Sequence, residues 1–343
     1  MSTRGKLNFG VIGVGRIGKI HIENLSHRLP NAKVIAVADI YSDELNKVAE
    51  QFNIDGTSSN YKEILNNPEV DAIVICSPTD THSEIIQEAA PLGKHIFCEK
   101  PIDLDLDKIS KINDIVSRHG VKFMVGFNRR YDPNFLKVHD TVQQGKIGKP
   151  HILNITSRDP DIPPREYITA SGGIFLDMTI HDFDMARYLI KSEVEEVYAK
   201  ADVLIDPVFK EAGDYDTAVI TLSFKNGAIG IINNSRKAVY GYDQRVEVFG
   251  SEGIVMVNNN SPDNHIHIDR KGTHSSLPLN FFMERYTQSY INEMKAFIDC
   301  IANDIPSPVT GYDGLQAVII GLAVKKSVEE NRPVKTVEIL KKI

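Results

Sequence analysis

Short apolar runs alternate with amphipathic segments through the first third of the chain. The runs are rich in Val, Ile and Ala, which is typical of strands buried on both faces of a sheet. Between the runs, apolar residues recur at helical spacing, and Gly120 stands where a helix C-cap is expected. The predicted strands cover residues 7–12, 33–39, 70–77, 94–100 and 121–127, and the predicted helices cover 18–29, 42–52, 82–93 and 104–120. Because strands and helices alternate, the pattern predicts a doubly wound parallel sheet of the α/β class.

A different pattern begins near residue 130. Strand-like runs follow one another with few helices between them, and KNG (225–227) and SEG (251–253) are hairpin turn signals. The predicted strands cover residues 151–157, 194–203, 216–224, 227–236, 245–250, 253–258 and 265–269; the predicted helices cover 133–144, 172–189, 281–303 and 312–330; a long polar, proline-rich loop covers 158–173. This pattern predicts an α/β domain with a large, mostly antiparallel open sheet, part of whose face a partner subunit covers.

The chain length supports a division into two domains. Its 343 residues are enough for two domains of ordinary size. We place the first at residues 1–127 and the second at 128–343, with the C-terminal helix able to pack back on the first domain.

Composition and charge narrow the class of protein. A formal net charge of −7 argues against a nucleic-acid partner, because phosphate binding favours a basic surface. No apolar run is long enough to span a bilayer, and the start of the chain lacks a signal-peptide pattern. Cys76, Cys98 and Cys300 are widely spaced and odd in number, which favours reduced thiols. We therefore expect a cytoplasmic protein without a membrane or nucleic-acid partner.

The first cofactor signal is GVGRIG, residues 13–18, between a predicted strand and a predicted helix. In a dinucleotide fold Gly13 permits a tight turn, Gly15 lets the backbone approach a pyrophosphate, and Gly18 lets the helix pack on the strand. The backbone amides of the helix start would hold the anion. The expected cofactor residues of this turn are Gly13, Gly15, Arg16, Ile17 and Gly18.

Asp39 ends the next predicted strand, where an acid that binds the adenosine ribose is expected. Its alternative role is that of an ordinary turn residue. No arginine follows within IYSDE, so a 2′-phosphate would meet uncompensated negative charge. The sequence therefore favours NAD over NADP.

CSPTDTH (76–82) ends a further strand of the same sheet, at the edge where such sheets bind ligands. Ser77, Pro78, Thr79 and His82 are expected at the cofactor. The alternative makes Thr81 a helix N-cap and His82 an ordinary first-turn residue.

FCEKP (97–101) places Glu99 and Lys100 directly after a buried run, where both would face the cofactor crevice. A lysine there can bind a substrate hydroxyl and favour its alkoxide character. A solvated surface lysine is the alternative.

GGIFLDMTIHDFDMARYL (172–189) is predicted to be one apolar helix that presents Asp177, His181 and Asp184 on one face. Three uses of these residues are open. They can form a catalytic acid–imidazole pair, a core with a hydrogen-bonded histidine, or a metal site completed by Asp184 or His151.

GVGRIG, CSPTDTH, FCEKP, GFNRRYD (126–132) and GGIFLDMTIHDFDMARYL together resemble the Gfo/Idh/MocA oxidoreductases, in the family's order and over essentially the whole chain. FCEKP with SRDP (157–160), DMTIH and YGYDQR (240–245) looks most like its inositol 2-dehydrogenases. The resemblance implies a Rossmann domain followed by an α/β domain whose open sheet packs in a tetramer or dimer, the tetramer being favoured.

The resemblance also implies roles for particular residues. The catalytic residues would be Lys100, Asp177 and His181, and Asp184 would be structural. The polyol would be bound by Lys100, Arg129, Asp159, Asp177, His181 and Tyr240, with Tyr242 the alternative tyrosine. No metal would be needed.

The implied reaction is NAD-dependent oxidation of a secondary hydroxyl of a cyclic polyol, myo-inositol to 2-keto-myo-inositol (scyllo-inosose), in inositol catabolism. His181 would take the hydroxyl proton. The ordinary pKa of histidine is about 6.5, so its neutral imidazole is suited to accept a proton near neutral pH. The alternatives are scyllo-inositol, another inositol isomer or a pyranose sugar as substrate, or an NAD(H)-binding sensor without catalysis.

Overall fold

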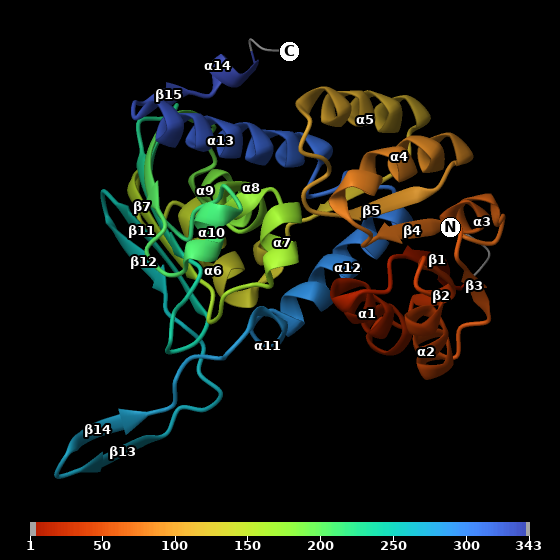
Figure 1. The fold of residues 1–343 in the computed structure, drawn as a ribbon, viewed down its shortest axis with the longest axis horizontal. Helices are drawn as coiled ribbons and strands as arrows, with labels where there is room; N and C mark the ends of the chain where they lie inside the picture. The colour runs from red at the N-terminus through yellow and green to blue at the C-terminus, as the bar shows by residue number, and fades with distance from the viewer. Residues whose placement is uncertain (1–4, 341–343) are drawn as a thin grey trace. The chain divides into compact units, whose positions relative to one another are not determined.

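The computed structural model describes residues 5–340, which belong to two compact units (Figure 1). The first unit contains the chain up to Tyr131 together with Gln288–Gln316. The second contains Asp132–Thr287 and the chain from Ala317 onward. The long helix α13 (Gly311–Glu330) therefore begins in the first unit and ends in the second.

The first unit is built on a six-stranded sheet in the order β3-β2-β1-β4-β5-β6. All its pairings are parallel, so the carboxyl ends of the strands lie at one edge. β4 is completely buried, as the continuous apolar run predicts. The strands are β1 (Leu7–Ile12), β2 (Ala32–Ala38), β3 (Gly56–Ser58), β4 (Ala72–Ile75), β5 (His95–Glu99) and β6 (Phe123–Gly126). The predicted doubly wound parallel sheet is confirmed.

The helices of the first unit are α1 (Arg16–Glu23), η1 (Asn24–Arg28), α2 (Ser42–Phe52), α3 (Tyr61–Asn66), α4 (Thr79–Ala89), η2 (Ala90–Leu92), α5 (Leu106–His119), η3 (Asn128–Tyr131) and α12 (Thr287–Ala302). Of these, α1, α2, α4 and α5 follow the predicted alternation, whereas α3 was not predicted and α12 was expected in the second domain. Gly120 ends α5 with φ 65°, as predicted. The Phe297 ring of α12 packs against Phe9 of β1 and Phe97 of β5, which attaches this late helix to the first sheet.

The alternative role of Thr81 as a helix N-cap is wrong. α4 begins two residues earlier, at Thr79, directly after Pro78. The Thr81 hydroxyl donates to the Pro78 carbonyl at 2.7 Å from within the first turn. The fixed φ of Pro78 suits a helix start, so the helix does not need a threonine cap.

The second unit is built on a seven-stranded sheet in the order β12-β11-β7-β10-β9-β8-β15. Only β7 and β10 pair in parallel among its strands, so the prediction of a mostly antiparallel sheet is confirmed. The KNG and SEG turns join β9 to β10 and β11 to β12 as predicted. The strands are β7 (Pro150–Arg158), β8 (Val194–Asp202), β9 (Thr217–Phe224), β10 (Ile229–Ser235), β11 (Asp243–Gly250), β12 (Gly253–Val257) and β15 (Val334–Lys335).

One predicted strand of this domain does not join the sheet. Residues 265–269 contain β13 (Ile266–Asp269), which pairs only with β14 (Gly272–Ser275) in a separate hairpin (Figure 1). Every residue of both strands is exposed, so no buried face adds this segment to the larger sheet.

The remaining helices belong to the second unit, where α6 and α9 pack on one face of the sheet. They are α6 (Pro133–Gln143), α7 (Arg165–Ala170), α8 (Gly173–Asp177), α9 (Ile180–Ile190), α10 (Pro207–Glu211), α11 (Phe282–Arg285) and α14 (Val337–Leu340). The polar loop predicted at residues 158–173 contains α7.

The single helix predicted over residues 172–189 is wrong, because the chain breaks between α8 and α9 at Met178 and Thr179. The backbone amides of both residues donate to the Ile174 carbonyl, and the Thr179 hydroxyl lies 3.1 Å from the same oxygen, so the last turn of α8 is widened. The Thr179 hydroxyl lies 2.7 Å from Asn234 Oδ1 of β10. Side-chain competition for backbone carbonyls thus interrupts the helix.

No helix within residues 5–340 is both long enough and apolar enough to cross a membrane. The three cysteines are free thiols, of which Cys98 and Cys300 are buried and Cys76 is half-buried.

Candidate active site

The glycine-rich turn of the first unit connects β1 to α1. Gly13 has φ +92°, and a Cβ there would lie 2.6 Å from the Ser77 backbone nitrogen. A Cβ on Gly18 would lie 2.0 Å from the Gly13 carbonyl oxygen. The protein itself therefore excludes side chains at both positions.

Gly15 differs from these two glycines. A Cβ added there would meet no described atom within 4 Å, so packing within the protein does not require glycine. No side chain caps α1, which begins directly after Gly15. The backbone at this helix start suits an anion, which the positive end of the helix dipole favours.

Asp39 holds the glycine-rich turn against the end of β2. Its Oδ2 accepts a hydrogen bond from the Val14 amide at 2.8 Å, and its Oδ1 accepts one from the Tyr41 amide at 2.9 Å. Each carboxylate oxygen has a second lone pair, which a ribose hydroxyl can use. Asp39 is therefore more than an ordinary turn residue.

The surface beside Asp39 is apolar and acidic. Ile40 and Tyr41 are 75% and 70% exposed, and they line a hollow together with Asp43 and Glu44. Lys19 and Lys47 both donate to Glu44 and lower its pKa to about 2. With both lysines paired, this hollow offers little to a 2′-phosphate.

His82 is buried and joins the loops that follow β4 and β5. Its Nε2 lies 2.8 Å from the Ser77 carbonyl oxygen, and its Nδ1 lies 2.9 Å from that of Pro101. Burial lowers the pKa of His82, and the contacts with the two carbonyls oppose this shift. His82 is thus not an ordinary first-turn residue, because it fixes the loop of Ser77 relative to the residue that follows Lys100.

The parallel sheet brings the remaining predicted residues of the first unit to the same edge. Glu99 is the last residue of β5, and Lys100 follows it half-buried, so the solvated-lysine alternative does not describe its surroundings. Arg129 lies in η3 after β6 and is only 5% exposed. The Gly-rich turn, Asp39, Ser77–Thr79 and Lys100 all follow strand ends of this sheet.

In the second unit, Arg236 connects two of the predicted substrate residues. Its Nη2 donates to Asp177 Oδ2 at 3.0 Å, and its Nη1 donates to Asp159 Oδ2 at 3.1 Å. The Tyr167 hydroxyl donates to the other Asp177 oxygen at 2.7 Å. One network therefore joins residues that follow β7, lie in α7 and α8, and follow β10.

This network is electrostatically tight. Burial lowers the pKa of the Arg236 guanidinium, but Asp177 and Asp159 outweigh burial and raise that pKa overall. Burial and the neighbouring Asp177 raise the pKa of Tyr167. Tyr167 is therefore a protonated donor and Arg236 a full cation at neutral pH, so both stabilise the Asp177 carboxylate.

The structure distinguishes the two tyrosines of YGYD. Tyr242 is 6% exposed and packs against the rings of Phe281 and Tyr286. Tyr240 is half-buried, and its hydroxyl donates to Asp243 at 2.6 Å and accepts from Arg158 at 2.9 Å. Tyr240 is thus the tyrosine with a polar environment.

His181 lies in the first turn of α9 and is half-buried, while Asp177 ends α8. The two residues do not share one continuous helix, so the spacing that placed them on one face was wrong. His151 is exposed at the start of β7, and Asp184 is 1% exposed within α9. Within residues 5–340, these side chains do not form a set of three closely spaced His, Cys, Asp or Glu donor atoms.

Arg236 and Tyr167 are site residues that the sequence did not predict. Arg236 directly follows β10, where a charged residue after an alternating strand is a weak signal. Tyr167 lies in the segment predicted to be a loop, where no helical or strand periodicity indicates which side chains are buried.

Comparison with known proteins agrees with this geometry. Residues 7–127 match the oxidoreductase family with an NAD-binding Rossmann fold, and residues 135–256 match the GFO/IDH/MocA C-terminal domain. The chain is 48% identical over 334 residues to a myo-inositol 2-dehydrogenase of Thermotoga maritima, covering 97% of this chain and 100% of that protein. The chain belongs to the Gfo/Idh/MocA oxidoreductase family.

Two further members of this family bear on the site. An inositol 2-dehydrogenase of Rhizobium meliloti is 44% identical over 96% of this chain and 98% of its own. A crystal structure of scyllo-inositol dehydrogenase from Lactobacillus casei with bound NAD(H) and scyllo-inositol has a TM-score of 0.90 at 29% identity, over 97% of this chain and 99% of that one.

The residues at the first sheet edge fit NAD. Gly15 leaves space at an uncapped helix start, Asp39 is fixed beside it, and the adjoining hollow is acidic. These features suit a pyrophosphate and an unphosphorylated ribose.

We expect Arg236→Met to destabilise the protein by about 3–5 kcal/mol, because it leaves the buried Asp177 and the half-buried Asp159 without their cation. Turnover should fall by about 100-fold as Asp177 moves. Denaturant unfolding and steady-state kinetics measure both effects.

Tyr167→Phe is the matched control, since it removes one hydrogen bond to the same carboxylate and costs only about 1 kcal/mol. An Arg236→Met protein as stable as wild type would contradict the role of the guanidinium.

Proposed function

We propose that this chain catalyses the NAD-dependent oxidation of a secondary hydroxyl of myo-inositol to 2-keto-myo-inositol (scyllo-inosose). The observation that carries the proposal is the 48% identity, over 97% of the chain, to a protein named myo-inositol 2-dehydrogenase. The residues needed for alcohol oxidation, Lys100 and His181, are both present.

NAD, when bound, supplies the hydride acceptor. Its site would consist of Gly13, Gly15, Arg16, Ile17, Gly18, Asp39, Ser77, Pro78, Thr79, His82, Glu99 and Lys100. Within this set, Gly13, Gly18, Asp39 and His82 shape the strand ends through the contacts described above.

The proposed proton chemistry rests on Lys100 and His181. The Lys100 ammonium donates a hydrogen bond to the reacting hydroxyl and stabilises the negative charge that develops on its oxygen. The neutral His181 imidazole accepts the hydroxyl proton. Removal of that proton makes departure of the hydride from the same carbon easier.

The network around Arg236 suits recognition of the other ring hydroxyls. Asp177 and Asp159 are carboxylates, which accept several hydrogen bonds each, and Arg236 and Tyr167 already orient them. Because the Arg236 guanidinium donates to both carboxylates, it favours their ionised forms in a mostly buried place. We assign Asp159, Asp177, Arg129 and Tyr240 to the polyol, and Asp177 also to stabilising His181 when it is protonated.

Scyllo-inositol is the second candidate substrate, because the similar Lactobacillus casei enzyme holds scyllo-inositol. It differs from myo-inositol in the orientation of one hydroxyl. A pyranose sugar, another inositol isomer and an NAD(H)-binding sensor without catalysis are further alternatives.

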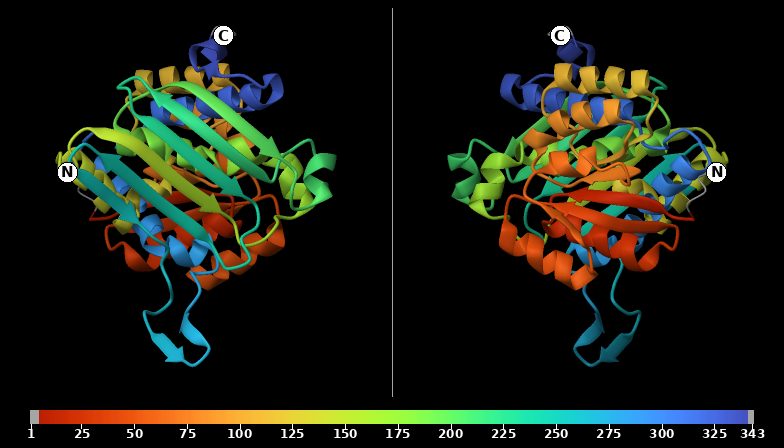
Figure 2. Two further views of the ribbon diagram at one scale, coloured as in Figure 1. Left: turned by 90° about the vertical axis from the view of Figure 1, so that its left-hand side faces the viewer. Right: turned by 90° about the vertical axis from the view of Figure 1, so that its right-hand side faces the viewer.

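The second sheet supports association with further copies of the chain. Ile254, Phe249, Ile152 and Ile229 are cross-strand neighbours along one row through β12, β11, β7 and β10. All four are exposed. The left view of Figure 2 shows that one face of this sheet has no helices packed on it. Such a continuous apolar row is typical of a protein–protein interface. We therefore propose a homo-oligomer, a tetramer, in which a second copy covers this face.

We also propose that the protein acts in the cytoplasm, in inositol catabolism. Three free thiols suit a reducing compartment.

The proposed reaction predicts which polyols reduce NAD. NADH formation measured across inositol isomers, glucose and xylose should show the highest kcat/KM for myo-inositol. Binding of NADH without turnover of any polyol would support the sensor instead.

Lys100→Ala and His181→Asn should each lower kcat by about 100-fold or more, and His181→Asn should leave NADH binding nearly unchanged. Each removes a group that acts on the reacting hydroxyl rather than on the dinucleotide fold. NADH formation and fluorescence titration with NADH provide the measurements. Near-normal turnover in either variant would refute its assigned role.

Asp39→Ala should lower kcat/KM for NAD by about 10–100-fold and reduce the preference for NAD over NADP, since the glycine-rich turn loses its acceptor and the ribose its partner. Asp43→Ala is the control, because it removes a carboxylate from the adjoining hollow without touching the turn. Undiminished kcat/KM for NAD in Asp39→Ala would contradict the assignment.

Ile229→Glu should reduce the molar mass in solution, because it buries a charge in the proposed interface. Light scattering after size-exclusion chromatography measures the mass. Ile266→Glu in the β13–β14 hairpin is the control, and it should leave the mass unchanged. If only the control lowers the molar mass, the proposed interface is wrong and the hairpin is the interface instead.

A further inference from the structure

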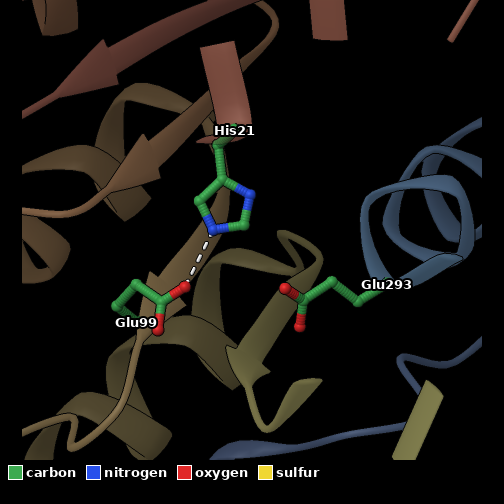
Figure 3. A group of neighbouring side chains, drawn as sticks. All are labelled: His21, Glu99 and Glu293. Carbon is green, nitrogen blue, oxygen red and sulfur yellow. Dashed lines mark hydrogen bonds and ion pairs between the residues drawn. The ribbon is translucent and has the colours of Figure 1, made fainter. Parts of the chain in front are cut away.

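Three side chains of the first unit face one another beneath the end of β5, and we call them the interior triad: His21, Glu99 and Glu293. They come from α1, β5 and α12 (Figure 3). His21 Nε2 lies 2.8 Å from Glu99 Oε1, and each residue offers an atom within 4.8 Å of the other two. The Glu293 carboxylate points toward the other two side chains in Figure 3.

The triad is shielded from water. His21 and Glu293 are 0% exposed, and the Glu99 side chain is 14% exposed. Neither Glu293 oxygen has a hydrogen-bond partner among the described residues. A buried carboxylate without partners is costly when ionised, and a second carboxylate opposite it increases the cost.

The surroundings are built around the Glu99 side chain. Glu99 pairs with Gly126 of β6, where an added Cβ would lie 3.0 Å from the Glu99 carboxyl carbon. The His21 ring is held edge-on by Phe97 at 5.1 Å and Tyr290 at 5.8 Å between ring centroids. Glycine therefore leaves room for the carboxylate, and the aromatic rings orient the imidazole toward it.

Among residues 5–340, the charge that acts most on Glu293 is the like charge of Glu99. Burial raises the pKa of Glu293 well above its ordinary value, and the charge of Glu99 raises it further. The pKa values of the nearby thiols are likewise raised, by burial first and then by Glu99. The titratable groups that face the triad are Cys76 after β4, His82 of α4, Cys98 of β5 and Tyr290 of α12.

We propose that Glu293 stays protonated in the native protein and that Glu293 and His21 together hold the ionised Glu99 side chain. Glu293 and His21 are then positioning residues for Lys100. His21 donates from Nε2 to Glu99. The protonated Glu293 carboxyl group donates toward the Glu99 carboxylate. One water can bridge the two groups, because each offers an oxygen within 4.8 Å of the other. The triad then carries one negative charge instead of two.

The position of Glu99 gives this arrangement a consequence for chemistry. Glu99 immediately precedes Lys100 in the chain, so fixing its side chain fixes the backbone that carries the lysine. This consequence rests on the proposed function, in which Lys100 binds the reacting hydroxyl. The protonation of Glu293 does not depend on it.

The first test compares pH-dependent stability of wild type and Glu293→Gln, whose amide imitates a neutral acid. The unfolded Glu293 has an ordinary pKa of 4.5, so unfolding above that pH releases a proton. The contribution of Glu293 to stability therefore falls as pH rises from 4.5 toward the raised native pKa. Glutamine does not titrate, so the variant should gain on wild type by about 6–12 °C in Tm between pH 5 and pH 8.

Infrared spectroscopy and elemental analysis complete this test. Wild type at pH 8 should show the carbonyl stretch of a buried carboxylic acid, and Glu293→Gln should lack it. A variant that loses stability relative to wild type as pH rises, or a stoichiometric divalent metal in purified wild type that the variant lacks, would overturn the proton assignment.

The second test addresses positioning through kinetics. Glu293→Ala and His21→Ala should lower kcat by about 10-fold with little change in KM for NAD, whereas Glu293→Gln should keep kcat within about twofold. Phe297→Leu on the same helix is the control, because it loosens packing without touching the triad. It should lower Tm and leave kcat unchanged.

The two tests separate the possible failures. Equal kcat losses in the alanine variants and in Phe297→Leu would overturn the positioning role. If wild type oxidises no polyol, the proposed function fails, yet the stability and infrared measurements still decide the protonation of Glu293.

Discussion

Parallel pairing of the first sheet is the constraint on which the candidate site depends. Since β1, β2, β4 and β5 run in one direction, the Gly-rich turn, Asp39, Ser77 and Lys100 all emerge at the same edge. Contacts between these strand ends then refine their places. Asp39 holds the turn through Val14, and His82 connects Ser77 to Pro101. The sheet supplies the common edge, and buried polar contacts supply the finer alignment.

Buried acids are stabilised in two different ways in this protein. In the second unit, the guanidinium of Arg236 donates to both Asp177 and Asp159 and favours their ionised forms. In the interior triad, we infer that a proton on Glu293 removes the negative charge that would otherwise face Glu99. An ionised acid with spare lone pairs can bind polyol hydroxyls, whereas a neutral acid serves to hold another group. The local counter-charge thus separates binding residues from positioning residues.

The segment that contains Asp177 and His181 shows where sequence periodicity misleads. The residues have helical spacing, and their apolar neighbours continue the pattern through Met178 and Thr179. A hydrogen bond from Thr179 to Asn234, more than fifty residues away, belongs to the interruption. Periodicity describes only local neighbours, so it could not detect this break. Periodicity could not predict the role of Arg236 for the same reason, since both its acidic partners are distant in the chain.

The sequence by itself determined the alternating α/β pattern, the mostly antiparallel second sheet, the glycine-rich turn and the family motifs, because these depend on local periodicity and short spacings. Only the tertiary structure decided that α12 belongs with the first sheet, that Tyr242 is a core residue while Tyr240 is polar, and that Arg236 links Asp159 to Asp177. Each of these depends on which distant side chains share a buried space, and burial sets both the partner and the charge that a side chain can keep.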